Sequence, residues 1–220
     1  LLDLKFYYNQ VMDFKFPKTI PIFPLSGVIY FPKTNLPLNI FEKRYLDLVN
    51  DSYDSNKLMG MVQSKKNSDD VYNVGCLGKI SELKKSEDGR IIINLTGITR
   101  FEIKKEIHND KLYRQFNVEY KRYESDLNNK QAELSDVLIN KLLDKTKKFF
   151  EINGLLINWD EFKKIGFTQQ IDTLSMIAPI SNEEKQKLLE IVTIDEKSKT
   201  LSEMIEFYLH EKKSVNKTIQ

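Results

Sequence analysis

The chain has 220 residues, of which 40% are hydrophobic and 30% charged, a composition typical of a globular protein with a buried core. The formal net charge of +2 gives no large one-signed field, which argues against a nucleic-acid partner. A single cysteine cannot form an intrachain disulfide, and no apolar run approaches the roughly 18 residues of a membrane-spanning helix. We therefore expect a cytoplasmic protein with no membrane contact.

Residues 18–124 are predicted to form mainly β-strands. The turn pair Asp88–Gly89 favours a tight hairpin, and Gly97 marks a bend between two further strands. The predicted strand 113–123 shows the alternation of a half-buried strand, with Phe116, Val118 and Tyr120 on one face. The seven segments, rich in β-branched and aromatic residues, are 19–23, 35–40, 57–63, 76–85, 90–97, 99–107 and 113–123. Their spacing predicts a closed or nearly closed barrel.

One helix is predicted inside this β-rich half, after the stretch "NLPLNI". Asn39 is expected to cap a helix that begins near Ile40, and Glu42 three residues later completes a capping box. The buried stripe of this helix would comprise Phe41, Tyr45, Leu48 and Val49. We further hypothesise that Glu42 or a nearby acid pairs with Arg44 or Arg100 and joins the helix to the barrel.

Helical periodicity replaces the strand pattern after a polar cluster at 124–129, where we place the domain boundary. Ser181 and Glu184 have the spacing of a capping box, and His210 is expected near a helix C-terminus. The first helix is predicted from Leu134, Leu138, Leu142 and Phe149; the others cover 158–166, 168–178, 181–192 and 195–213, the last with a stripe of Leu201, Met204, Ile205, Tyr208 and Leu209.

The fold class is therefore α+β. A β-rich domain with one helix is expected over 18–124, followed by a helical bundle over 125–213. The N-terminal extension 1–17 and the tail 214–220 are expected to be flexible.

The sequence gives weak support for catalysis and none for a metal or cofactor. One cysteine and two histidines, His108 and His210, cannot supply the four clustered ligands of a structural zinc site. The string "GCLGKIS" lacks the spacing of a phosphate-binding loop, and we interpret it as a bulge or turn in the barrel. Neither histidine accompanies a recognisable nucleophile motif.

Five strings in order, "IPIFPLSGVIYFPKTNLPLNIFEKRYLDLV", "LMGMVQ", "VGCLGKISEL", "DGRIIINLTGITRFEI" and "LSMIAPISNEEKQKLLEI", resemble the N-terminal substrate-binding domain of the ATP-dependent Lon protease. The resemblance covers residues 19–209 and implies a PUA-like pseudobarrel followed by a helical bundle. In Lon this region engages protein substrates, whereas ATP hydrolysis and peptide cleavage belong to later domains. The strings match the family framework at Phe41, Glu42, Arg44, Tyr45, Gly97, Arg100, Glu184, Lys185 and Gln186.

The resemblance implies a non-catalytic protein- or peptide-binding module, similar to stand-alone bacterial members of this family. It would engage unfolded or extended segments, or act as an adaptor for a separate protease. Candidate contacts are Tyr30, Phe31, Leu36, Met59 and Met61, for which an ordinary core position remains the alternative. Two other functions stay open. A groove rich in Arg and Lys would favour a nucleic-acid-binding PUA-like protein, and a pocket with a nucleophile beside a base would favour a hydrolase.

Overall fold

The computed structural model describes residues 16–127 and 136–218, with the side chains of all of these except 136–138 and 212–218. The chain divides into two compact units, Leu1–Asn129 and Lys130–Gln220, called unit 1 and unit 2 below and described separately. Of the extensions expected to be flexible, residues 1–15 and 219–220 lie outside the described residues, whereas residues 214–218 form the end of the last helix.

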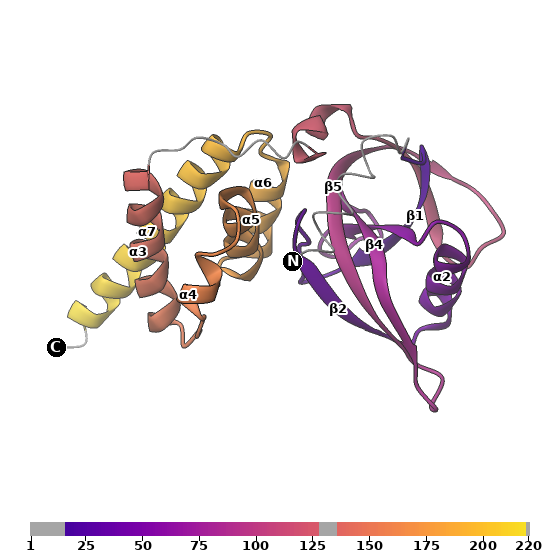
Figure 1. Cartoon of the computed structure of the whole chain (residues 1–220), viewed down its shortest axis with the longest axis horizontal. Coiled ribbons are helices and arrows are strands. Elements are labelled where there is room, and N and C mark those ends of the chain that lie inside the picture. Colours follow the sequence, from indigo (N-terminus) through magenta and orange to yellow (C-terminus); the bar gives the residue numbers. More distant parts are fainter. Residues whose placement is uncertain (1–15, 128–135, 219–220) are drawn as a thin grey trace. The chain divides into compact units, whose positions relative to one another are not determined.

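Unit 1 contains a six-stranded mixed sheet (Figure 1). Its elements are β1 (Thr19–Leu25), β2 (Asn35–Ile40), α2 (Lys43–Asp54), β3 (Leu58–Gln63), β4 (Val74–Lys85), β5 (Ile91–Ile107), β6 (Arg114–Glu119) and the 3₁₀-helix η1 (Lys121–Leu127). The strand order is β2-β5-β4-β3-β1-β6, and β6 also pairs with β5. This last pairing closes β5, β4, β3, β1 and β6 into a ring, which β2 joins only through β5.

The six strands correct the expectation of seven, because the fifth and sixth predicted segments form one continuous strand, β5. The predicted bend corresponds to a bulge within β5, where the register against β4 leaves Ile98 as an extra residue directly after Gly97. The N–H of Gly97 donates to the carbonyl of Thr34 at 2.9 Å, and a Cβ at this position would lie 2.3 Å from the carbonyl oxygen of Phe31. Glycine is therefore required here by the close approach of the loop before β2.

Two further strand predictions are settled by the pairing registers. The string "GCLGKIS" lies within β4, whose register against β5 shifts between Ile80 and Glu82 and leaves Ser81 as an extra residue, so the interpretation as a bulge is confirmed. The last strand is shorter than predicted, because β6 ends at Glu119 and the chain then turns into η1. Phe116 and Val118 are buried in the barrel core with Ile20 and Phe101, as the alternation predicted.

Unit 2 is helical. It comprises α3 (Asp136–Ile152), α4 (Trp159–Phe162), α5 (Phe167–Ile177), α6 (Asn182–Glu190) and α7 (Ile194–Thr218). α3 packs on α7, where Lys145 forms an ion pair with Glu206 at 2.6 Å. Leu142 and Phe149 on α3 are buried, as predicted, whereas Leu134 and the side chain of Leu138 lie outside the described part of the chain.

The last helix is longer than the predicted 195–213, since α7 continues to Thr218. His210 consequently lies within the helix and not at its C-terminus, which corrects the capping role expected for it; its Nε2 is 4.0 Å from Oε1 of Glu206. The predicted stripe is confirmed at Leu201 and Ile205, which are fully buried, while Met204, Tyr208 and Leu209 are partly buried.

The capping box at the start of α6 is confirmed. The Ser181 hydroxyl accepts from the N–H of Glu184, whose Oε2 accepts from the N–H of Ser181 at 2.9 Å. The same oxygen accepts from the hydroxyl of Tyr208 on α7 at 2.6 Å. Burial alone would raise the pKa of Glu184, but hydrogen bonds from Tyr208 and Ser181 outweigh it and hold this pKa below its usual value.

This geometry predicts a pH-dependent contribution of Glu184 to stability. Because the pKa is lower in the folded state, the stabilisation is present above the unfolded pKa of about 4.3 and is lost as pH falls through the folded value. Glu184→Gln, which still permits a capping box, should lower the free energy of unfolding at pH 7 by about 1 kcal/mol. In urea titrations followed by fluorescence of Trp159, the difference in free energy of unfolding between the variant and the parent should become smaller below about pH 4. The same difference at pH 7 and below about pH 4 would contradict this role for the Glu184 charge.

Candidate functional site

The largest of three cavities described in the chain lies at one end of the barrel in unit 1 and encloses about 670 Å³. This size lies within the usual range of ligand clefts. We call it the β1–β2 groove and define it by its lining residues, Phe23, Pro24, Leu25, Ser26, Leu38, Asn39, Ile40, Phe41, Glu42, Arg44, Tyr45, Ser64, Ser68, Asp69 and Arg114.

The groove forms where β6 pairs with only part of β1, at the end of the ring of strands. β6 pairs with β1 only over Thr19–Ile22, and its first residue, Arg114, lies opposite Ile22. Among the residues that the structure describes, the end of β1 therefore has no strand on that side. β2 occupies the neighbouring stretch of β5 but does not pair with β1 among the described residues. The sheet leaves a gap between the end of β1 and the end of β2, and the start of α2 borders it.

The string "FEKRY" lies in this groove, although not in the predicted capping arrangement. Asn39 belongs to β2, and α2 begins only at Lys43, with Glu42 as its N-cap and no side-chain cap bond. The prediction of a capping box formed by Asn39 and Glu42 is therefore wrong, because pairing with β5 as far as Ile40 holds residues 39 and 40 extended.

Phe41 is likewise not part of the buried stripe, since it is 66% exposed. Tyr45 does pack inward against Phe23, with ring centroids 4.1 Å apart. Burial raises the pKa of Tyr45, although the nearby Arg44 opposes the shift. The groove thus offers one large, accessible aromatic side chain at the end of β2 beside a buried aromatic floor.

The charges of the groove are balanced. Arg44 donates from Nε to Glu42 at 3.0 Å, so one predicted pairing is confirmed, but it is local to the helix start and does not join the helix to the barrel. Arg114 donates to both carboxylate oxygens of Glu106 at 2.7 Å and to the backbone carbonyl of Asp69. The hydrogen bond from Arg114 lowers the pKa of Glu106. Two arginines and two acids line the groove, which therefore presents no basic track for a polyanion.

The five candidate contacts do not line this groove. Tyr30, Phe31, Leu36, Met59 and Met61 are all buried, none more than 7% exposed. Their apolar side chains occupy the interior of unit 1, the position that was left open as the alternative. The accessible surface is provided instead by their neighbours in the chain, above all Phe41, and by Pro24, Asn39 and Arg114, which the sequence did not single out.

The remaining framework residues support the structure. Arg100 donates to Asp126 of η1 in a buried pair, a partner that was not predicted. Its guanidinium also lies 4.2 Å from the ring centre of Tyr123. In unit 2 burial lowers the pKa of Lys185, and the buried amide of Gln186 donates to Glu190 at 2.8 Å.

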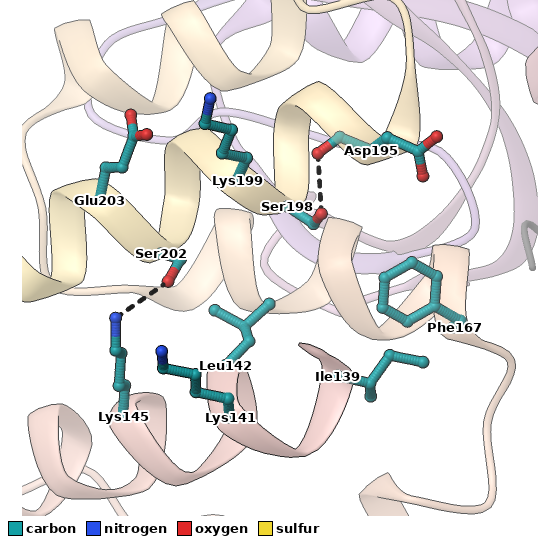
Figure 2. Close-up of a pocket in the computed structure, with 10 residues that line it drawn as sticks. All are labelled: Ile139, Lys141, Leu142, Lys145, Phe167, Asp195, Ser198, Lys199, Ser202 and Glu203. Carbon is teal, nitrogen blue, oxygen red and sulfur yellow. Dashed lines mark hydrogen bonds between the residues drawn. The ribbon is translucent and has the colours of Figure 1, made fainter. Parts of the chain in front are cut away.

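A second cavity of about 430 Å³ lies in unit 2 between α3, α5 and α7 (Figure 2). Its floor is apolar, with Ile139, Leu142 and Phe167. Lys145 reaches across from α3 to Ser202 on α7 at 3.5 Å, so polar groups at its edge already have partners within the unit (Figure 2).

The histidine and cysteine side chains considered for catalysis lie outside these three cavities. Neither His108 nor His210 lines any of the three, and Cys76 is buried in β4. Over residues 16–127 and 136–218 no group of three or more His, Cys, Asp or Glu side chains is placed to hold a metal ion. Within the same ranges no helix is both long and apolar enough to cross a membrane.

The family model of the ATP-dependent protease La (LON) substrate-binding domain matches residues 19–206. The chain belongs to this family. Among curated relatives of the LON family, Lon protease of Syntrophus aciditrophicus is 26% identical over 210 residues, covering 89% of this chain and 26% of the relative. Lon protease of Desulfosudis oleivorans is 25% identical over 205 residues, covering 89% of this chain and 24% of that relative. The chain therefore spans about a quarter of the length of these Lon proteases.

Two solved structures share the fold. A Lon N-terminal domain protein from Xanthomonas campestris has a TM-score of 0.64 at 19% identity, covering 86% of this chain and 98% of that chain. The N-terminal domain of the Mycobacterium avium complex Lon protease has a TM-score of 0.63 at 15% identity, with the same coverage. The resemblance to the LON substrate-binding domain inferred from the sequence strings is thus confirmed.

Proposed function

We propose that this chain is a non-catalytic module that binds protein substrates, and that extended or unfolded segments bind in the β1–β2 groove of unit 1. The observation that carries the proposal is the 66% exposure of Phe41 at the edge of a 670 Å³ groove with balanced charge. Exposed aromatic side chains beside pockets are typical anchors of protein interfaces. Membership of the LON substrate-binding domain family supports the same class of ligand.

The finer parts of the proposal concern architecture and partners. We assign unit 1 as a PUA-like pseudobarrel domain over 18–124 and unit 2 as a helical bundle domain over 125–213. The module would present bound segments to a proteolytic machine, either as part of a longer chain or as an adaptor. Nucleic acid is the weaker candidate, because the groove has as many acidic as basic side chains.

Phe41→Ala should weaken binding of a fluorescein-labelled, chemically unfolded protein by roughly 5- to 30-fold, equivalent to about 1–2 kcal/mol for one aromatic anchor. The measurement is fluorescence anisotropy at fixed salt. Because Phe41 is exposed, the variant should unfold at the same urea concentration as the parent.

Phe207→Ala provides the matched control, since Phe207 is a similarly exposed phenylalanine in unit 2. It should leave the affinity unchanged. Equal affinities for the parent and Phe41→Ala would refute the groove as the binding site, and preferential binding of structured RNA over unfolded protein would refute the ligand class.

A further inference from the structure

The outer edge of β2 carries backbone groups that no described strand bonds. One position before β2, the N–H of Gly97 donates to the carbonyl of Thr34, which makes this a hydrogen-bonded pair of the β2–β5 ladder. Such pairs alternate along antiparallel strands, so positions 36, 38 and 40 face β5 and positions 35, 37 and 39 face away. Pro37 agrees with this assignment, because proline lacks an N–H and is tolerated in an edge strand where the amide would face outward.

The end of β1 forms the opposite wall of the gap. The N–H of Val118 donates to the carbonyl of Lys18, so by the same alternation positions 20 and 22 of β1 face β6. The next position of this phase, Pro24, lies past the last β1–β6 pair and lines the groove. It offers a carbonyl but no N–H. The gap therefore presents donors and acceptors on β2 and an acceptor on β1.

We propose that an extended segment of a substrate protein adds to the outer edge of β2 as a further strand. The inference rests on the proposed function and specifies how the same groove recognises its ligand. The segment exchanges backbone hydrogen bonds with Asn35 and Asn39 and donates to the carbonyl of Pro37, while an apolar side chain of the segment contacts Phe41. Backbone pairing of this kind gives affinity with little dependence on sequence, and side-chain contacts add selectivity for apolar residues.

The edge favours a loose polypeptide segment over a second folded copy of this chain. The free edge of a copy would be its own β2, which is bonded to β5 and bordered by its own groove. Pro37 also removes one of the three outward amides, and proline on an edge strand discourages pairing between folded sheets. A flexible segment can enter a gap between two strands without these restrictions.

Backbone methylation of the ligand tests the proposal. The probe is a fluorescein-labelled ten-residue peptide with alternating apolar and polar side chains, compared with two twins N-methylated at one or the other set of alternate amides. One twin should bind at least tenfold more weakly than the parent peptide, because its methyl groups block the amides that face β2. The alternating side chains prevent a one-residue shift, which would move the apolar residues to the opposite face.

A matched pair of protein variants tests the same edge. Asn39→Pro removes the outward amide that the ladder with β5 does not use, and it should weaken binding of the peptide at least fivefold more than Asn39→Ala, which removes the side chain but keeps the amide. Pro37→Thr adds an outward amide and should tighten binding. Circular dichroism and urea unfolding establish that each variant folds, and Pro37 itself indicates that proline is compatible with this edge.

The outcomes separate the two claims. If Phe41→Ala weakens binding of the peptide, but both methylated twins bind as tightly as the parent peptide and Asn39→Pro leaves the affinity unchanged, strand addition is refuted and the proposed function stands. If the unmethylated peptide does not bind the parent protein, both are refuted. If instead the protein dimerises in sedimentation and Asn39→Pro abolishes the dimer without affecting peptide binding, a second copy occupies the edge and the inference is overturned.

Discussion

Replacing Arg100 with alanine is expected to lower the free energy of unfolding of unit 1 by about 3–5 kcal/mol, the usual cost of removing one partner of a buried ion pair. Arg100 is 2% exposed and lies on β5. Its Nε and one terminal nitrogen donate to the two carboxylate oxygens of Asp126 at 2.9 and 2.7 Å. The variant would leave the Asp126 carboxylate buried without this counter-charge, and it would also remove the contact between the guanidinium and the ring of Tyr123.

Hydrogen exchange of β5 and β6 in urea is the suitable measurement, because it reports on unit 1 separately. Arg90→Ala is the matched control, since Arg90 pairs with Asp88 at an exposed turn and such pairs contribute about 0–1 kcal/mol. An Arg100→Ala protein as stable as its parent would show that the pair does not hold η1 against the barrel. Because α2 has no part in this pair, the loss should not depend on Glu42.

A second large effect is expected in unit 2, where Lys197 on α7 donates to Asp172 on α5 at 2.5 Å. Both side chains are almost completely buried. Lys197→Ala should lower the free energy of unfolding of this unit by about 3–5 kcal/mol, because it leaves the Asp172 charge buried without its ammonium partner. Fluorescence reports on this unit specifically, since the only tryptophan of the chain, Trp159, packs against Phe150 in it.

The exposed Lys199, two residues further along α7, provides the control, and Lys199→Ala should change stability by less than about 0.5 kcal/mol. The double variant Asp172→Leu/Lys197→Met should recover most of the loss, because an apolar pair of similar volume removes both charges from the interior. A double variant as unstable as Lys197→Ala would contradict the electrostatic origin of the effect.

The features predicted correctly from the sequence are those set by local patterns. Ser181 and Glu184 carry their capping chemistry within four residues, and the alternation that buries Phe116 and Val118 is visible in the strand itself. The prediction that Asn39 caps a helix is wrong because a long-range contact decides its conformation. Asn39 has the composition and spacing of a helix cap, but pairing of β2 with the distant β5 overrides that local preference.

Long-range partners and the groove could not be predicted in this way. Asp126 lies in the polar cluster that marks the domain boundary, and nothing local indicates that it pairs with Arg100, 26 residues earlier. The groove arises from topology, because β6 covers only part of β1 while β2 pairs with β5 alone. One signal was available in the sequence: Pro37, in the middle of a strand, indicates an edge and thus an unpaired side.

The central claim is that protein substrates contact the β1–β2 groove, and site-specific photo-cross-linking tests it most directly. The photoreactive residue p-benzoylphenylalanine would replace Phe41 in one protein and Phe207 in another, each illuminated with the same unfolded substrate protein. We predict strong cross-linking from position 41, lost on competition with unlabelled substrate, and background cross-linking from position 207. Equal cross-linking from the two positions, or none from position 41, would contradict the assignment of the groove as the substrate site.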